Sequence, residues 1–222
     1  NFIRELEQTQ DEKLTKVYTA NECVEEENGA TKTFDLGNDV ELEILYQKYY
    51  EEKATTENDY SVCCMINQGS GSDARHYLFT GDLEAGGESS LVDSNNLPKC
   101  ELYKAGHHGS KTSSSAKLLA KIQPEIVCVC ACAGSSEYTS KNENQFPTQQ
   151  FIDRIAPYTD AVYVTTLCVD YEKGLFQSMN GNIVVSASAG KETLVSCSAS
   201  AIKLKETEWF KKNRTCPLDW VA

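Results

Sequence analysis

Tyr77-Leu78-Phe79-Thr80-Gly81-Asp82 and Lys104-Ala105-Gly106-His107-His108-Gly109-Ser110 are the two stretches that decide the fold. In each, a strand-like run ends, a glycine permits close approach of the backbone, and a side chain able to ligate a metal follows. A carboxylate and an imidazole at adjacent strand ends suit a hard or borderline divalent cation. The pattern therefore predicts a metal site at one sheet edge, formed by Asp82 and the histidine pair.

The two histidines are not expected to share one role. On an extended backbone, adjacent side chains point to opposite sides. We therefore expect only one of His107 and His108 to reach a given metal, and the other to line the substrate pocket or bind a second group. Alone, a Gly-Asp turn or a His-His pair is more often structural than functional. The two in order, each after a strand and followed by a Ser/Thr-rich loop and a helix, are far more specific.

The surrounding sequence alternates strand and helix patterns, which indicates an α/β fold with layered sheets. A polar segment over 47–59 predicts a surface loop, and Asn180-Gly181 predicts a hairpin that pairs 174–179 with 182–188. The other expected elements are strands over 17–20, 40–46, 60–67, 75–80, 101–105, 126–133 and 161–166, and helices over 2–14, 88–93, 113–122 and 147–155.

Composition places the chain among globular proteins. It has 222 residues, of which 40% are hydrophobic and 24% charged. No apolar run approaches the roughly 18 residues that a membrane span needs, so no membrane segment is predicted. No basic and apolar leader is visible, so we expect the ten cysteines to be reduced thiols in a cytoplasmic protein. On strand 126–133 we expect Cys128, Cys130 and Cys132 to alternate onto one face as small, mostly buried thiols.

Charge is spread unevenly along the sequence. The net charge is −12, and the first 60 residues carry 16 acidic and six basic side chains. Five lysines and one glutamate fall between Lys99 and Lys121. This locally basic stretch would steer a polyanion, although a solvated helix face explains Lys117 and Lys121 equally well.

Three segments resemble the second half of a metallo-β-lactamase-fold hydrolase, most closely its ComEC-like competence-protein branch. They are Asn58-Asp59-Tyr60-Ser61-Val62, the run that ends in Gly81-Asp82, and Gly106-His107-His108-Gly109-Ser110. The resemblance covers about 34–188. Its specific part is the combination of Gly-Asp with Gly-His-His-Gly-Ser.

The resemblance implies an αββα sandwich with one or two metals at one edge, commonly zinc, with manganese as the alternative. Asp82 would bridge two metals, His107 would be a metal ligand, and His108 would be the less favoured ligand and a substrate contact. These three would form the catalytic set. The expected reaction is hydrolysis by a metal-bound hydroxide. Phosphodiesters, including nucleic acid, are the usual substrates of this branch, so a phosphodiesterase or nuclease is expected.

The loop after the histidines supplies candidate substrate contacts. Ser110, Lys111 and Thr112 can hydrogen-bond a phosphate at the start of the following helix. Plain helix capping is the alternative, and the two are compatible.

Two departures from the family pattern matter. The principal ligand motif, His-x-His-x-Asp-His, is absent, and His76 is the only histidine outside the His-His turn. Phe146-Pro147 stands where family members often have His-Pro, which leaves any substrate role of that position in doubt. Three histidines also exclude a two-metal site built from histidine alone.

The missing motif has two explanations. The helix over 2–14 resembles the segment that follows the motif in intact members. We therefore hypothesise that residues 1–200 are the carboxy-terminal portion of the domain, with a basic and aromatic tail over 201–222 packed on it or extending from it. The amino-terminal half would then lie in the same precursor or in a separate chain. The alternative is a non-catalytic binding or regulatory module that keeps the fold without a complete metal site.

Overall fold

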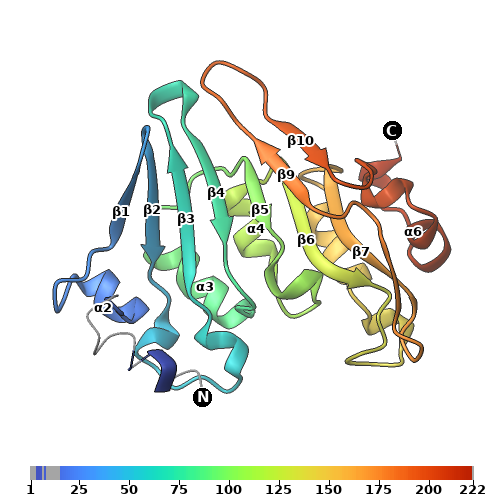
Figure 1. The fold of residues 1–222 in the computed structure, drawn as a ribbon, viewed down its shortest axis with the longest axis horizontal. Coiled ribbons are helices and arrows are strands. Elements are labelled where there is room, and N and C mark those ends of the chain that lie inside the picture. The colour runs from blue at the N-terminus through green and yellow to red at the C-terminus, as the bar shows by residue number, and fades with distance from the viewer. Residues whose placement is uncertain (1–3, 7, 9–15, 222) are drawn as a thin grey trace.

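A mixed eight-stranded sheet forms the centre of the protein (Figure 1). The computed structural model describes residues 4–6, 8 and 16–221. The strands lie side by side in chain order, antiparallel from β1 to β4, parallel from β4 to β7, and antiparallel again at β8. Their bounds are β1 Thr33–Gly37, β2 Val40–Leu45, β3 Cys63–Gln68, β4 Arg75–Phe79, β5 Leu102–Lys104, β6 Ile126–Ala133, β7 Val162–Asp170 and β8 Leu175–Ser178. The predicted α/β class is confirmed.

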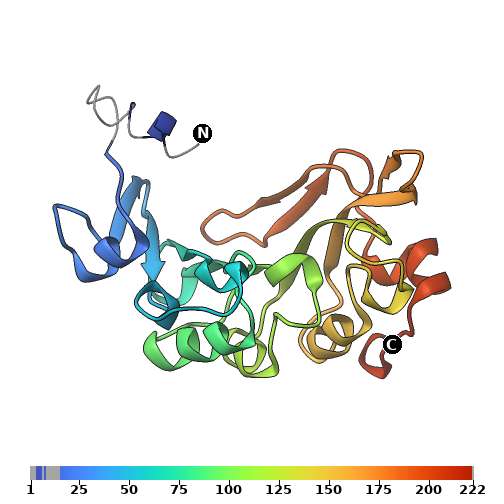
Figure 2. The ribbon, with the colours of Figure 1, turned by 90° about the horizontal axis from the view of Figure 1, so that it is seen from below.

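Three helices cover one face of the sheet, each in the crossover between two parallel strands (Figure 2). They are α3 Ala85–Ser94, α4 Ala116–Ile122 and α5 Gln149–Ile155. Ser115 caps α4 and Thr148 caps α5 through their side-chain oxygens. Apolar side chains of these helices pack on the strands in the main core, where Leu118, Ile152 and Val129 are fully buried. These crossovers bring the ends of β4, β5 and β6 to one edge.

Over the opposite face, the described residues place a helix at one end and a two-stranded hairpin at the other, and the hairpin loop reaches as far as Arg75 of β4 (Figure 2). Helix α2 (Ala20–Glu25) packs over β1 and β2 in a small cluster with Ile44. Strands β9 (Ile183–Ser186) and β10 (Leu194–Cys197) form a separate hairpin over β6 and β7. Between them, Ile66, Tyr77 and Phe79 are only partly buried.

The carboxy-terminal segment joins the main core. Helix α6 (Glu208–Asn213) contributes Phe210, which is 1% exposed and contacts the Trp220 ring at 5.7 Å. The connections hold short 3-10 helices over Lys48–Tyr50, Glu57–Tyr60, Gly71–Asp73, Gly106–Gly109, Asn142–Asn144, Leu204–Glu206 and Leu218–Trp220. No helix within the described residues is long and apolar enough to cross a membrane.

The predicted hairpin at Asn180-Gly181 is wrong. β8 pairs with β7, and β9 pairs with β10. The reason is that Asn180 is fully buried and its amide bonds to other segments. Its Nδ2 donates to the carbonyl oxygens of Val164 and Ile202, and its Oδ1 accepts from the Ile202 N–H. The chain therefore leaves the sheet here instead of turning back along it.

Three other predictions need correction. The strand over 17–20 is wrong, because Thr19 and Glu22 form a capping box that begins α2. The segment over 47–59 is not simply a surface loop, because Gln47 and Asp59 are buried and Gln47 Nε2 donates to the Asp59 carbonyl. Most of the helix predicted over 2–14 lies outside the described residues.

The thiols of β6 do not share one buried face. Cys128 is buried beneath the β9–β10 hairpin, whereas Cys130 is exposed and Cys132 half-buried. A register shift between Val129 and Cys132 breaks the expected alternation. All ten cysteines are free thiols.

Candidate metal and phosphodiester site

Asp82 lies just past the end of β4, in a turn that only glycine fits well. Gly81 has φ +56°, and a Cβ there would lie 2.7 Å from the Ser61 hydroxyl oxygen. The same hydroxyl accepts the Asp82 N–H at 2.9 Å, and the Gly81 carbonyl accepts the His107 N–H at 3.0 Å. Backbone bonds thus join the Asp82 turn to the histidine turn.

The histidine turn is left-handed, not extended. His107 and His108 have φ of 44° and 56°, and Gly109 follows with φ 79°. This region is costly for residues with a Cβ, on the order of 1–3 kcal/mol each, and such outliers cluster at functional sites. The expectation that the two rings point to opposite sides is therefore wrong. Their centroids lie 6.2 Å apart, and both rings reach the edge that carries Asp82 and Glu84.

His108 is the histidine that faces Asp82. Its Nδ1 lies 2.7 Å from the Cys130 carbonyl oxygen, and its Nε2 lies 3.7 Å from Asp82 Oδ1. A carbonyl oxygen only accepts, so Nδ1 carries the proton of the neutral ring and Nε2 is left as an acceptor. Metal-binding histidines are commonly oriented by such a backbone bond.

A β-bulge presents that carbonyl. Two residues of β6, Cys130 and Ala131, lie opposite the single residue Thr165 of β7. The Thr165 hydroxyl donates to the Ala131 carbonyl oxygen at 3.0 Å. Bulges of this kind occur next to active sites, where they re-aim backbone and side-chain groups.

His107 has different neighbours. Its Nδ1 lies 3.8 Å from Glu84 Oε1 and 3.4 Å from the Thr112 hydroxyl. Burial lowers the pKa of His107, against the opposing effect of the Asp82 and Glu84 carboxylates. Asn58 Nδ2 donates to Glu84 Oε1 at 3.3 Å. The sequence pattern assigns no role to Glu84, although its position two residues after Asp82 places it just past the end of the same strand.

The loop after the histidines is held by hydrogen bonds with two charged side chains, Glu88 and Arg154. Glu88 is fully buried and accepts the N–H groups of Ser114 and Ser115, each at 2.6 Å. Burial raises the pKa of Glu88, and its hydrogen bonds oppose that rise. The Arg154 guanidinium donates to the carbonyl oxygens of Ser113 and Ser114. The N–H groups of Ser114 and Ser115, just before α4, are therefore engaged by Glu88.

The predicted substrate contacts separate into two directions. Thr112 bonds to Ser110 Oγ and reaches toward His107, so it lies at the edge of the site. Ser110 is itself 5% exposed. Lys111 extends over the long loop of 134–146, where its Nζ donates to Asn144 Oδ1 at 2.8 Å.

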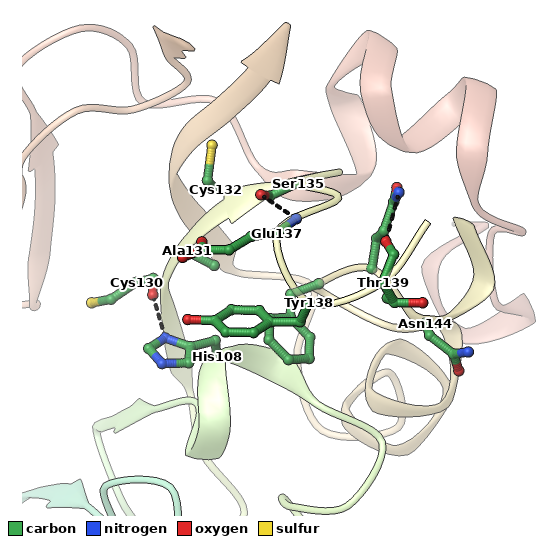
Figure 3. Close-up of a pocket in the computed structure, with 11 residues that line it drawn as sticks. His108, Cys130, Ala131, Cys132, Ser135, Glu137, Tyr138, Thr139 and Asn144 are labelled. Atoms are coloured by element: carbon green, nitrogen blue, oxygen red, sulfur yellow. Dashed lines mark hydrogen bonds between the residues drawn. The ribbon is translucent and has the colours of Figure 1, made fainter. Parts of the chain in front are cut away.

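A pocket opens directly beside His108 (Figure 3). Its volume is about 210 Å³. The Phe146 ring stacks on His108 with a centroid distance of 6.0 Å and an interplanar angle of 29°. Tyr138 lies next in the row, 6.1 Å from Phe146. The pocket is also lined by Cys130, Cys132, Glu137, Asn144 and Gln145.

The residues present fit part of a metal site. Asp82 Oδ1 and neutral His108 Nε2 are acceptors that face each other, and such a pair repels unless a proton or a metal cation lies between them. Carboxylate oxygen and imidazole nitrogen are a donor set used for zinc. A protein site needs at least three ligands, however, and the described part of the chain contains no group of three or more His, Cys, Asp or Glu able to hold a metal. His76 lies elsewhere, with Nδ1 2.7 Å from Asn67 Oδ1.

Comparison with known proteins links the chain to two bacterial proteins. No family model matches it. It is 30% identical over 121 residues to Recombination protein 2 of Haemophilus influenzae, which covers 54% of this chain and 14% of that protein. It is 34% identical over 55 residues to ComE operon protein 3 of Bacillus subtilis, which covers 25% of this chain and 7% of that protein. The chain thus spans a small part of the length of the relatives it matches, and it is similar to one segment of each.

Proposed function

We propose that this chain supplies part of the active site of a metal-dependent phosphodiesterase or nuclease. The observation that carries the proposal is the pair of facing acceptors, Asp82 Oδ1 and His108 Nε2, 3.7 Å apart. Asp82 and His108 would hold a divalent metal, zinc or manganese. The bound metal would supply a Lewis acid for the scissile phosphate and lower the pKa of the attacking water. His108 takes the ligand role here in preference to His107, because its Nδ1 is already fixed by Cys130.

The remaining residues of the site position the substrate. Thr112 can donate a hydrogen bond to a phosphate oxygen, and Lys111 adds positive charge at the rim. Phe146 packs on both histidine rings and would help to hold their orientation. His107, close to Glu84, can hold or release a proton at Nδ1.

The relatives support a nucleic-acid substrate. One is named for recombination and the other for the ComE operon, and a role in recombination would fit a nucleic-acid substrate. A cytoplasmic site of action fits the free thiols.

The missing ligands would come from the amino-terminal half of an αββα sandwich. The sheet face between α2 and the β9–β10 hairpin supports this part of the proposal, because Ile66, Tyr77 and Phe79 lie there with part of their surface uncovered. An apolar sheet face is stable when a second layer packs on it. A second sheet on this face would lie near the edge that carries Asp82 and would complete the ligand set.

One observation favours a second candidate, a binding or regulatory module. Two metal-capable side chains facing each other are fewer than a catalytic zinc site uses. If no partner supplies the others, the fold would serve to bind nucleic acid or another protein without hydrolysis.

Hydrolysis of bis(p-nitrophenyl) phosphate distinguishes the hydrolase from the binding module. The assay uses the longer protein that the proposal calls for, in which this chain is joined to the amino-terminal half, with zinc or manganese and with or without EDTA. The Asp82→Asn variant is compared with Asp93→Asn, a surface carboxylate paired with Lys117. We expect metal-dependent hydrolysis that Asp82→Asn abolishes and Asp93→Asn leaves intact. A longer protein that binds no metal would establish the binding module instead.

A further inference from the structure

Three aromatic side chains, His108, Phe146 and Tyr138, line the pocket beside His108, and Figure 3 shows His108 and Tyr138 at this pocket. His108, Phe146 and Tyr138 follow one another at centroid distances of 6.0 and 6.1 Å. Tyr138 ends the row and is 75% exposed. The row therefore presents an aromatic face to solvent within two rings of the candidate ligand His108. A planar group could stack on the exposed ring of Tyr138, which is tilted by 42° to Phe146.

From this arrangement we infer that the pocket is a subsite for one unpaired nucleobase of a single-stranded nucleic acid. The inference rests on the proposed function, since the base would belong to a nucleotide next to the phosphate at Asp82 and His108. Aromatic side chains bind single strands in this way because every base has a face that stacks.

The polar groups of the pocket suit the edge of a base. Asn144 Oδ1 accepts from Lys111, so the Asn144 amide nitrogen is left as a donor. Gln145 Nε2 donates to the Thr139 carbonyl oxygen, which leaves its Oε1 as an acceptor. The Glu137 carboxylate lines the same pocket and can accept from an exocyclic amino group. Donors and acceptors are therefore both present beside the stacking face.

The size of the pocket limits its occupant. A volume of about 210 Å³ is below the roughly 300–1,000 Å³ of pockets that enclose drug-sized ligands. It accommodates one ring system and not a stacked pair of bases. A base in a duplex has both faces covered and its pairing edge occupied, so only an unpaired base can enter.

Lys111 connects the subsite with the phosphate. Its ammonium group bonds to the rim of the pocket through Asn144, while its backbone neighbour Thr112 reaches His107. A nucleotide with its base in the pocket would place its phosphate near this positive charge. The base in the pocket and the phosphate beside Lys111 would together fix the orientation of the bound strand across the site.

Binding of short single strands to the 222-residue chain tests the inference without any hydrolysis. Fluorescence anisotropy in EDTA compares a labelled single-stranded oligonucleotide with an abasic strand of equal length and charge. We expect the strand with bases to bind roughly 5- to 10-fold more tightly than the abasic strand. This factor corresponds to the lower end of the range of binding energies measured for one stacked base. Tyr138→Ala should remove this preference and Tyr138→Phe should keep it. Tyr171→Ala is the control, since Tyr171 is 39% exposed and does not line the pocket.

Each other outcome has a defined meaning. Three outcomes would overturn the subsite. They are equal binding of the two strands, no measurable binding of either strand, and equal effects of Tyr138→Ala and Tyr171→Ala. Phosphodiester hydrolysis is measured in parallel on the longer protein. Hydrolysis without a base preference removes the subsite and leaves the proposed function standing. A base preference that depends on Tyr138 without hydrolysis in any metal keeps the subsite and removes the hydrolase.

Discussion

His108 donates its Nδ1 proton to the carbonyl oxygen of Cys130 at 2.7 Å, and this bond determines that Nε2 of the same ring faces Asp82. The neighbouring His107 lies instead between Glu84 and Thr112. Two adjacent histidines on one left-handed turn therefore have distinct environments, and their contributions to metal binding can be separated.

Replacing each histidine in turn should show which one is the ligand. We expect His108→Ala to weaken zinc binding by more than the roughly 10- to 100-fold that loss of an outer-shell partner costs. His107→Ala should weaken it by less than that range. Competition with a chromophoric chelator measures both dissociation constants, with His76→Ala as the control. An equal or larger loss in His107→Ala would show that the ligand is His107.

Glu88→Gln should destabilise the loop behind the site. The Glu88 carboxylate accepts two backbone N–H groups, and an amide offers only one oxygen and turns a donor toward the other. We expect the free energy of unfolding in urea to fall by about 1–3 kcal/mol, the cost of a buried unsatisfied group. Glu125→Gln, on an exposed residue, should change it by less than about 0.5 kcal/mol. A similar loss in both variants would contradict this role for Glu88.

Asp160 should make the attachment of the carboxy-terminal segment pH-dependent. Hydrogen bonds from Lys203 and Lys205 lower the pKa of the Asp160 carboxyl group. A lowered folded-state pKa gives stability that is present above the ordinary carboxyl pKa and is lost as pH falls toward the lowered value. Both ion pairs are partly exposed. We therefore expect the free energy of unfolding of the wild-type protein to exceed that of Asp160→Asn by about 1 kcal/mol at neutral pH.

Urea unfolding from neutral pH down to about pH 3 measures this difference, which should shrink as pH falls below the ordinary carboxyl pKa of about 4, because the unfolded chain then takes up the proton more readily than the folded protein. Asp219→Asn, at an exposed carboxylate of the carboxy-terminal segment, is the control. A gap that stays constant with pH would show that the two lysines do not stabilise the folded protein through this charge.

Arg214→Lys should loosen the loop that carries Tyr138 and Phe146. The Arg214 guanidinium stacks 4.7 Å from the Trp209 ring and donates to the carbonyl oxygens of Gln145 and Pro147. A lysine ammonium lacks the planar fork that makes these bonds together. Hydrogen exchange should become faster across 134–146 in Arg214→Lys. Lys212→Ala, on an exposed neighbour, should leave exchange there unchanged, and equal protection in all three proteins would contradict the prediction.

The sequence predicts best where one local signal decides the structure. The apolar run 126–133 is β6 with the same bounds, and its first four residues are buried on both faces of the sheet. The glycines before Asp82 and His107 correctly placed these side chains at one edge, since each follows a strand of the parallel part of the sheet.

Other features depend on contacts that the local sequence does not contain. Asn180-Gly181 has the composition of a hairpin turn, yet the Asn180 amide is used to join Val164 with Ile202, 22 residues further along the chain. The left-handed conformation of His107 and His108 follows from the bonds that hold the turn, not from a preference of histidine. Glu84 joins the site because α3 begins directly after it.

The bulge in β6 makes the orientation of His108 depend on strand length and not on a side chain. Any residue at position 130 except one that breaks the strand would still offer the carbonyl that holds the ring. Loss of one residue between Val129 and Cys132 would restore regular pairing with β7 and turn that carbonyl away. Selection on this part of the site would therefore tolerate substitution and reject deletion. Among relatives, the number of residues between Val129 and Cys132 should stay constant, whereas the residue at position 130 should vary.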